Sequence, residues 1–348
     1  MKAICIICCA LIPLAVFGAQ ASAGCSMVGD VNSDGRINTA DSLLALRMAV
    51  GSMPPDIERA DANRDDDINS LDALVILSMA QKTQVCVNAP EVVSGTFDVT
   101  IDIYNAADLD SGQFDLSFDP GVVNVSDVHD WNIDDITVPI DSWDFLDADT
   151  IRVLFNLPGV DGVSGSGQIA MISFEITGAV KDESVLDISN GELFDLDTYS
   201  EGIPAIWNDC EVTIGVPVMV NAQEVVSGGT FVATINIENV TDLDSGQFDL
   251  SFVPGVVNVS DVHDGNIGGT TVPISDWRFM DADTIRVLFD LPSESTVTGS
   301  GSLATVNFEI TGSVGATSIL DISNGELFDL DTYSEGIPAT WTDCEVIV

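Results

Sequence analysis

Residues 112–118 read Gly-Gln-Phe-Asp-Leu-Ser-Phe, and the same seven residues return as 246–252. Residues 147–155, Asp-Ala-Asp-Thr-Ile-Arg-Val-Leu-Phe, return as 281–289 at the same offset of 134 positions. An internal repeat of this length indicates two copies of one domain rather than the short units of a solenoid. The sequence therefore predicts two similar domains in the chain after residue 85.

Apolar residues within each copy alternate with polar ones. Phe97, Val99 and Ile101 are separated by single polar residues, and the same alternation recurs at 172–176. A period of two is typical of a strand with one buried face, and clusters of Gly, Pro, Asn and Asp separate the runs. We therefore predict a mainly β chain with two tandem antiparallel β-sandwiches.

Two shorter repeats precede these copies. Residues 30–41 read Asp-Val-Asn-Ser-Asp-Gly-Arg-Ile-Asn-Thr-Ala-Asp, and residues 61–72 read Asp-Ala-Asn-Arg-Asp-Asp-Asp-Ile-Asn-Ser-Leu-Asp. Both have oxygen side chains at positions 1, 3, 5, 9 and 12, which is the spacing of an EF-hand calcium loop, and position 7 supplies a backbone carbonyl. The predicted calcium ligands are Asp30, Asn32, Asp34, Arg36, Asn38 and Asp41 in loop 1, and Asp61, Asn63, Asp65, Asp67, Asn69 and Asp72 in loop 2.

Position 6 of such a loop makes a sharp turn with positive φ. Gly35 occupies it in loop 1, and Asp66 in loop 2 tolerates it at about 1 kcal/mol relative to Gly. Each loop is followed by a short apolar helical pattern, at 43–50 and 71–79. Because two short helices bury little surface, we predict that bound calcium holds this small domain folded.

The N-terminus has the pattern of a secretory signal. Lys2 precedes an apolar run, and residues 21–23, Ala-Ser-Ala, form a cleavage site. We predict export to the outside of the cell or to the cell surface, with no transmembrane segment. A second interpretation is lipidation at Cys25, because residues 22–25 partly match a lipobox.

The charge of the chain is strongly negative. There are 56 acidic and 10 basic residues, for a net charge of −46. From Val87 onward 46 acidic residues face only four basic ones. Such a surface repels nucleic acid and anionic membranes, so neither is an expected partner.

Residues 29–38 and 61–72 resemble a type I dockerin, in which each loop and helix lacks an entering helix. In that family, loop positions 10 and 11 and the following helix face the partner. The resemblance implies partner contacts by Thr39, Ala40, Leu46 and Arg47 in repeat 1, and by Ser70, Leu71, Leu77 and Ser78 in repeat 2. For Leu46 and Leu77, core packing is an equal alternative. Arg47 of repeat 1 is matched by the uncharged Ser78 in repeat 2, so the partner-binding surfaces of the two repeats differ in charge.

Residues 112–125 and 165–174 resemble two strands of cohesins, the partners of dockerins. The resemblance implies jelly-roll-like sandwiches whose flat face docks a dockerin. A carbohydrate-binding sandwich has a related topology and stays open as an alternative. The expected organisation is a signal peptide at 1–23, a dockerin at 25–83 and cohesin-like sandwiches at 85–215 and 217–348.

Four cysteines follow the signal segment, namely Cys25, Cys86, Cys210 and Cys344. In a cohesin-like sandwich the first and last strands run side by side, which implies a Cys86–Cys210 disulfide. The alternative is a Cys25–Cys86 disulfide. Copy 2 has Met219 where copy 1 has Cys86, which leaves Cys344 without a partner there.

Other candidate sites are weaker. His129 and His263 share a repeat position, and loop histidines explain them better than a metal or catalytic site. Acidic pairs near 147 and 195 offer further calcium sites in the sandwiches, although solvated carboxylates are the simpler explanation. The chain has no Ser/His/Asp or Cys/His constellation, and we expect no enzyme activity.

The sequence thus predicts a secreted, non-catalytic scaffold that mediates calcium-dependent dockerin–cohesin interaction. Its cofactor is Ca²⁺, with two ions in the dockerin. The expected partners are extracellular proteins that bear cohesins or dockerins, including further copies of this chain. The alternative function is an extracellular carbohydrate-binding or adhesion accessory protein, attached to a scaffold through its dockerin and bound to polysaccharide.

Overall fold

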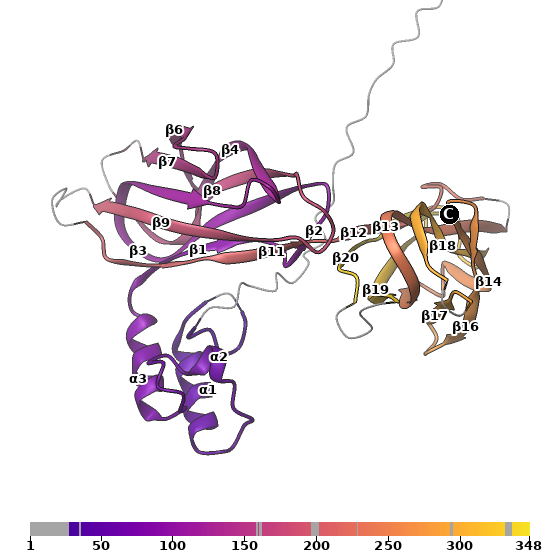
Figure 1. Ribbon diagram of the computed structural model, residues 1–348, viewed down its shortest axis with the longest axis horizontal. Helices are drawn as coiled ribbons and strands as arrows, with labels where there is room; N and C mark the ends of the chain where they lie inside the picture. The colour runs from indigo at the N-terminus through magenta and orange to yellow at the C-terminus, as the bar shows by residue number, and fades with distance from the viewer. Residues whose placement is uncertain are drawn as a thin grey trace, which may run out of the picture.

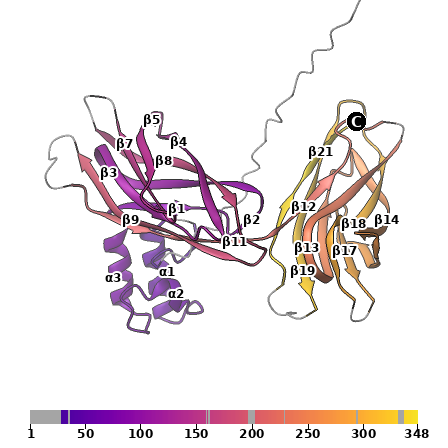
Figure 2. The same cartoon turned by 45° about the horizontal axis from the view of Figure 1, so that its top comes forward.

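The computed structural model describes residues 28–348 apart from 35, 158, 160–161, 196–201, 228, 293–294 and 331–335. A small helical domain comes first along the chain, and two β-sandwiches follow it (Figure 1). The helices lie against one side of the first sandwich, and the second sandwich lies beyond the end of the first (Figure 2). The expected signal segment and Cys25 lie outside the described residues.

The helical domain contains α1 (Thr39–Ala49), α2 (Ile57–Ala60) and α3 (Ser70–Met79). α1 and α3 pack together, and Ser42 Oγ donates a hydrogen bond to the carbonyl of Ala73 at 2.7 Å. The buried apolar cluster of this domain consists of Val31, Ile37, Ala45, Ala60, Ala73 and Ile76. So small a core, half of it alanine, contributes little hydrophobic stabilisation.

Eleven strands form the first sandwich, and a single long strand links its two layers. The first half of β3 pairs with β8 and β1, while its second half pairs with β7 and β9. One layer therefore has the order β5-β4-β8-β3-β1-β10, and the other has the order β6-β7-β3-β9-β11-β2. The strands are β1 (Thr83–Asn88), β2 (Val92–Val93), β3 (Thr96–Ser117), β4 (Val123–Ile133), β5 (Ile136–Val138), β6 (Ile140–Phe145), β7 (Thr150–Asn156), β8 (Val163–Ile176), β9 (Glu183–Asp195), β10 (Ala205–Asn208) and β11 (Cys210–Ile214).

The second sandwich repeats this topology. The long strand β13 again pairs with β18 in one half and with β17 and β19 in the other. The prediction of two tandem sandwiches in a mainly β chain is confirmed, and the pairing is antiparallel except at short edge contacts such as β12 with β20. The strands are β12 (Val216–Asn221), β13 (Thr230–Ser251), β14 (Val257–Ile267), β15 (Thr270–Val272), β16 (Ile274–Phe279), β17 (Thr284–Asp290), β18 (Val297–Ile310), β19 (Thr317–Asp329), β20 (Ala339–Thr342) and β21 (Cys344–Ile347).

The alternating apolar residues fill the space between the layers. In the first sandwich the buried ring of Phe174 stacks on Phe97, with ring centroids 5.4 Å apart, and meets Phe118 edge to face at 5.8 Å. Phe308 makes the same two contacts in the second sandwich, at 5.0 Å and 5.8 Å. Aromatic pairs of this geometry add to the stabilisation from burial alone.

The two sandwiches meet without a spacer, because only Gly215 separates β11 from β12. Across the junction, Lys181 Nζ contacts Asp329 Oδ2 at 2.6 Å, and the hydroxyls of Ser94 and Thr340 lie 2.6 Å apart. A side chain on Gly215 would collide with Val92 and Pro338. The junction is therefore closely packed.

Candidate calcium loops and docking surfaces

Loop 1 is organised by Asp41, the residue at its last position. The Asp41 carboxylate accepts hydrogen bonds from the N–H groups of Val31 at 3.0 Å and Asn38 at 2.8 Å. Asn38 in turn accepts one from Ala40 N at 2.8 Å and thereby caps α1. The side chain that closes the loop thus also starts the helix, which joins the loop to the helix as one unit.

Loop 2 repeats this geometry. Asp72 accepts from the N–H groups of Asn63 at 3.2 Å and Asn69 at 2.9 Å, and Asn69 caps α3. One carboxylate oxygen each from Asp61, Asp65 and Asp72 lies within 4.8 Å of the other two. Among the described residues, this is the one group of acidic, His or Cys side chains that converges closely enough to hold a metal ion.

The charges at the base of both loops are buried. Asp30, Asp41, Asp61 and Asp72 are at most 6% exposed. Burial raises the pKa of Asp41, and the nearby Asp34 raises it further, although three backbone N–H groups lower it. Buried carboxylates that repel one another fit a bound divalent cation, because the cation would neutralise them with the hard oxygen ligands that calcium prefers.

The remaining proposed ligands lie at the rim of each loop in matching positions. Asn32 donates to Asp34 at 2.8 Å in loop 1, as Asn63 donates to Asp65 at 3.0 Å in loop 2. The N–H groups of the two position-7 residues, Arg36 and Asp67, donate to the position-5 carboxylates at 3.0 Å and 3.1 Å.

The backbone turns where the sequence predicts it in loop 2. Asp66 at position 6 has φ of +65°. Gly35, its counterpart in loop 1, lies outside the described residues. Position 4 of each loop is also left-handed, which the sequence did not predict, since Ser33 and Arg64 have φ of +58° and +59°.

The residues that the dockerin resemblance assigns to partner contact lie on the surface of α1 and α3. Leu46 is 40% exposed, and neither Leu46 nor Leu77 belongs to the buried cluster of the domain. Leu77 is half-buried, and the other six assigned residues are exposed; these are Thr39, Ala40, Arg47, Ser70, Leu71 and Ser78.

Two further leucines on the same helices are exposed, although the sequence placed them only in the apolar helical patterns and not on the partner surface. Leu43 is 57% exposed and Leu74 is 60% exposed, and they occupy equivalent positions in the two repeats. With Leu46 and Leu71 they form a set of four exposed leucines, which we call the leucine patch. The sequence contains a signal for this patch, because the two repeats both have leucine at the equivalent helix positions 43 and 74, which lie outside the buried cluster.

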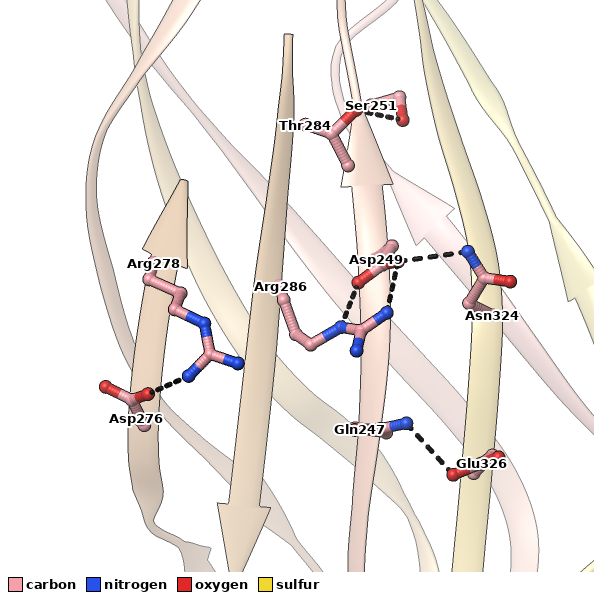
Figure 3. A network of polar contacts seen from close by, with 9 residues as sticks. All are labelled: Gln247, Asp249, Ser251, Asp276, Arg278, Thr284, Arg286, Asn324 and Glu326. Atoms are coloured by element: carbon pink, nitrogen blue, oxygen red, sulfur yellow. Dashed lines mark hydrogen bonds and ion pairs between the residues drawn. The ribbon is translucent and has the colours of Figure 1, made fainter. Parts of the chain in front are cut away.

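Each sandwich has an ordered polar row on the outer face of one layer, drawn for the second sandwich in Figure 3. Asp249 on β13 accepts two hydrogen bonds from Arg286 on β17, at 2.7 Å and 2.8 Å, and a third from Asn324 on β19 at 3.0 Å. The Arg286 guanidinium, more than Asn324, lowers the pKa of the Asp249 carboxyl. Gln247 and Glu326 form a parallel contact at 2.9 Å.

The first sandwich has the same row, in which Asp115 accepts from Arg152 at 2.6 Å and 2.8 Å and from Asn190 at 3.0 Å. We call the outer surface of the β6-β7-β3-β9 layer and its counterpart β16-β17-β13-β19 the arginine face. All three arginines after Val87 lie on it, at positions 152, 278 and 286. The sequence alone assigns no role to this repeated arginine.

The predicted Cys86–Cys210 disulfide is wrong. Cys86 has a free thiol, as does Cys344, while Cys210 is disulfide-bonded. Cys86 lies opposite Asn208 of the parallel strand β10, whose side-chain amide donates to its sulfur at 3.4 Å. The chain then changes layers, so that Cys210 on β11 lies opposite Leu186 instead. The alternative Cys25–Cys86 bridge is excluded by the same free thiol.

The weaker candidates find little support. His129 is partly exposed and His263 is exposed, and their Nε2 atoms lie 3.8 Å and 3.5 Å from the carboxylates of Asp127 and Asp261. Within the described parts of the sandwiches, no three acidic, His or Cys side chains converge on one point. Asp197 and Asp331, two of the acidic residues considered for further calcium sites, lie outside the described residues.

Comparison with known families matches all three domains. A family model for the cohesin domain matches residues 83–214 and again residues 216–348. The chain belongs to the cohesin family. A second model, for the dockerin type I domain, matches residues 28–78. We refer to the three domains as the dockerin, cohesin 1 and cohesin 2, and their predicted order is confirmed.

Several solved structures are similar to parts of the chain. A non-cellulosomal cohesin from Archaeoglobus fulgidus is 20% identical, over 38% of this chain and 90% of its own, with a TM-score of 0.33. The seventh ScaB type I cohesin from Pseudobacteroides cellulosolvens is 18% identical over 38% of this chain and 92% of its own, with a TM-score of 0.33. The type II cohesin dyad from the ScaA scaffoldin of Acetivibrio cellulolyticus is 13% identical over 76% and 98%, with a TM-score of 0.32. No curated protein matches the chain in sequence.

Cohesins and dockerins are assembly domains, and type I dockerins bind calcium. The chain is therefore a non-catalytic scaffold that mediates cohesin–dockerin interactions, and its partners bear dockerins or cohesins. Within the described residues, no helix has the length and apolar content needed to cross a membrane.

Proposed function

We propose that this protein is a secreted scaffold that assembles with further copies of itself when calcium is present. The dockerin of one copy binds the arginine face of a cohesin in another copy. Each dockerin holds two calcium ions, one in each loop, through the twelve ligand residues named above. The observation that carries the proposal is that one chain presents both halves of a docking pair.

The buried carboxylates support the calcium sites. Four aspartates lie at the base of the two loops with almost no exposure, in a domain whose apolar core is very small. Without a cation their mutual repulsion and desolvation would oppose folding. Calcium removes that cost, so the domain folds when the metal binds.

The leucine patch and the arginine face support docking between copies. Four leucines that are 40–60% exposed lie on α1 and α3, which pack against each other, and exposed apolar patches mark interaction sites. Charged side chains on the arginine face are already held by hydrogen bonds, so little side-chain freedom is lost on binding.

The distribution of charge favours a dockerin rather than another cohesin as the bound domain. Residues 28–82 contain ten acidic and five basic residues, a balance that two calcium ions bring close to neutrality. The rest of the chain is strongly acidic, so two cohesins repel each other while a calcium-loaded dockerin is not repelled.

Light scattering of the mature chain tests this function. We expect the mean mass to rise with calcium and to return to that of one chain with EDTA. The double variant Leu43→Asp/Leu74→Asp should still bind two calcium ions but remain a single chain. Ile57→Asp is the matched control, because Ile57 is equally exposed on α2, outside the leucine patch.

The alternative function predicts a different result. A chain that stays single with calcium, yet is retarded in a native gel containing polysaccharide, would be a carbohydrate-binding accessory protein. That outcome overturns self-assembly and leaves the dockerin as an attachment to a separate scaffold.

A further inference from the structure

Cohesin 1 holds loop 1 of the dockerin through Gln84, a side chain at the start of β1. Gln84 Oε1 accepts a hydrogen bond from Ile37 N at 3.3 Å, and Gln84 Nε2 donates one to Ile37 O at 3.0 Å. The same amide group lies 3.4 Å from the carbonyl of Met79 at the end of α3. Gln84 is only 1% exposed, and its side-chain amide is satisfied by the dockerin backbone, so these hydrogen bonds would be lost to water if the dockerin moved away.

The neighbouring loop residue makes a second contact. The guanidinium carbon of Arg36 lies 5.0 Å from the centre of the Tyr104 ring on β3 of cohesin 1, which is a cation–π geometry. Tyr104 is itself held by a hydrogen bond from its hydroxyl to Asp102 at 3.1 Å. Asn105 donates to the carbonyl of Ala80 at 3.2 Å, just after α3.

This contact set is specific to cohesin 1. The strand registers align β12 with β1 and β13 with β3, so that Pro217 stands in place of Gln84 and Glu238 in place of Tyr104. Proline offers no side-chain amide and glutamate no ring. Cohesin 1, which follows the dockerin, therefore has the two side chains that contact loop 1. Cohesin 2, which follows another cohesin, lacks them.

Loop 2 has no comparable contact within the described residues. Its side-chain hydrogen bonds join residues of the loop and the first turn of α3 to one another, and its backbone N–H groups at Asp61 and Ala62 donate to carbonyls of α2. The two loops are thus alike in their proposed ligands and unlike in their surroundings. Loop 1 lies against cohesin 1 at positions 7 and 8, and loop 2 does not.

We propose that calcium binding at loop 1 is coupled to the seating of the dockerin on cohesin 1, so that calcium fixes the orientation of the dockerin. This inference rests on the proposed function, in which the Arg36 carbonyl is a calcium ligand. Cohesin 1 contacts the side chain of that ligand residue and both the N–H and the C=O of the next residue. A loop ordered around calcium places the Arg36 side chain over the ring of Tyr104 and the Ile37 backbone within hydrogen-bonding distance of Gln84.

The coupling works in both directions. If calcium strengthens the contact with cohesin 1, the contact strengthens calcium binding by the same factor. The leucine patch stays open in the seated dockerin, since Leu43 and Leu74 remain exposed. Seating therefore orients the dockerin for a partner and does not block it.

Calcium titration of the mature chain tests the coupling. In the double variant Gln84→Ala/Tyr104→Ala, we expect the calcium affinity of loop 1 to fall about tenfold, within the usual range of coupling between sites, while that of loop 2 is unchanged. Arg36→Ala tests the same contact from the dockerin side, because it keeps the carbonyl ligand and leaves cohesin 1 unaltered. Glu238→Ala, at the matching position of cohesin 2, is the control and should change neither affinity.

Small-angle X-ray scattering gives an independent readout. In the Leu43→Asp/Leu74→Asp background, which stays a single chain, the protein should become more extended and more variable in shape when EDTA removes calcium. Adding Gln84→Ala/Tyr104→Ala to that background should make it so even with calcium. Unchanged loop 1 affinity in both variants, or an unchanged scattering profile after EDTA, would overturn the coupling. If neither loop binds calcium, the proposed function fails. If both loops bind and the chains assemble while the variants behave as wild type, only the coupling fails.

Discussion

Cohesin 1 and cohesin 2 repeat the same interior and differ where each meets a neighbour. The buried aromatic cluster and the Asp–Arg–Asn row have nearly the same distances in both. On the strand that contacts the dockerin, Gln84 of cohesin 1 is replaced by Pro217 in cohesin 2. At the junction, Lys181 of cohesin 1 contacts Asp329, and the matching residue of cohesin 2 is Gly315. The fold fixes the interior, whereas the neighbouring domain determines which residues the edges need.

The largest effects should come from the shared interior and should be equal in both domains. Phe174→Ala and Phe308→Ala each remove a fully buried ring with two aromatic neighbours, so we expect each to cost about 3–5 kcal/mol. Chemical unfolding of the two variants measures the loss. Phe145→Ala, at an exposed edge residue, is the control and should cost much less. Losses that differ strongly between the two variants would contradict a common interior.

The polar row should have the next largest effect. Asp115→Asn and Asp249→Asn each remove a charge that accepts three hydrogen bonds, so we expect each to lower the free energy of unfolding by about 1–3 kcal/mol at pH 7. Similar losses in the two domains would support one role for both rows. A loss in only one domain would show that the rows serve different purposes.

The same variants should depend on pH in a defined direction. The arginine beside each aspartate, and to a lesser extent the asparagine, lowers the pKa of its carboxyl in the folded protein. The stabilisation is therefore complete above the unfolded pKa of about 3.9 and is lost as pH falls through the lower folded pKa. Urea unfolding between about pH 6 and pH 3 should show the difference between wild type and each Asn variant shrinking below about pH 4. If the difference in the free energy of unfolding stayed constant down to pH 3, the ion pairs would not be the source of the stabilisation.

Much of this architecture could be predicted from the sequence, because local patterns specify it. The period of two places Val99 and Ile101 between layers, and the loop spacing brings Asp61, Asp65 and Asp72 together without any knowledge of the fold. Both patterns act over a few residues, where the geometry of a strand or a loop is already fixed.

Features that depend on strand register could not be predicted in the same way. Asp115 and Arg152 are 37 positions apart, and only the pairing of β3 with β7 brings them together. The disulfide prediction was wrong for the same reason, since the chain changes layers between Asn208 and Cys210. The contact between Ile37 of loop 1 and Gln84 likewise joins two domains, and neither domain's sequence pattern predicts how the two pack together.

Replacing Lys181 by glycine gives cohesin 1 the residue that cohesin 2 has at the matching position, Gly315. The backbone of Lys181 has φ of +76°, and the matching Gly315 has φ of +86°. Lys181→Gly removes about 1 kcal/mol of backbone strain and a partly buried ion pair of similar size, so the free energy of unfolding should change by less than about 0.5 kcal/mol. Lys181→Ala keeps the strain and should be less stable by about 1 kcal/mol. Small-angle scattering should show a looser junction in both variants, and an unchanged profile would mean that the Asp329 contact does not hold the two cohesins together.

The smallest effect concerns the arginine face, where Ser142 and Asp144 of cohesin 1 are replaced by Asp276 and Arg278 in cohesin 2. Asp144 lies opposite Arg152 in cohesin 1, and Arg278 occupies the matching position opposite Arg286 in cohesin 2. If dockerins bind this face, exchanging the two residues through Asp144→Arg and Arg278→Asp should exchange the preference of the two cohesins for a given dockerin by a few-fold, since exposed charges contribute about 0.2–1 kcal/mol. Binding of the isolated dockerin to the full chain, measured at low and high salt, checks this, because the preference should weaken as salt screens the charge. A preference that does not follow the exchanged charge would place the docking surface elsewhere on the sandwiches.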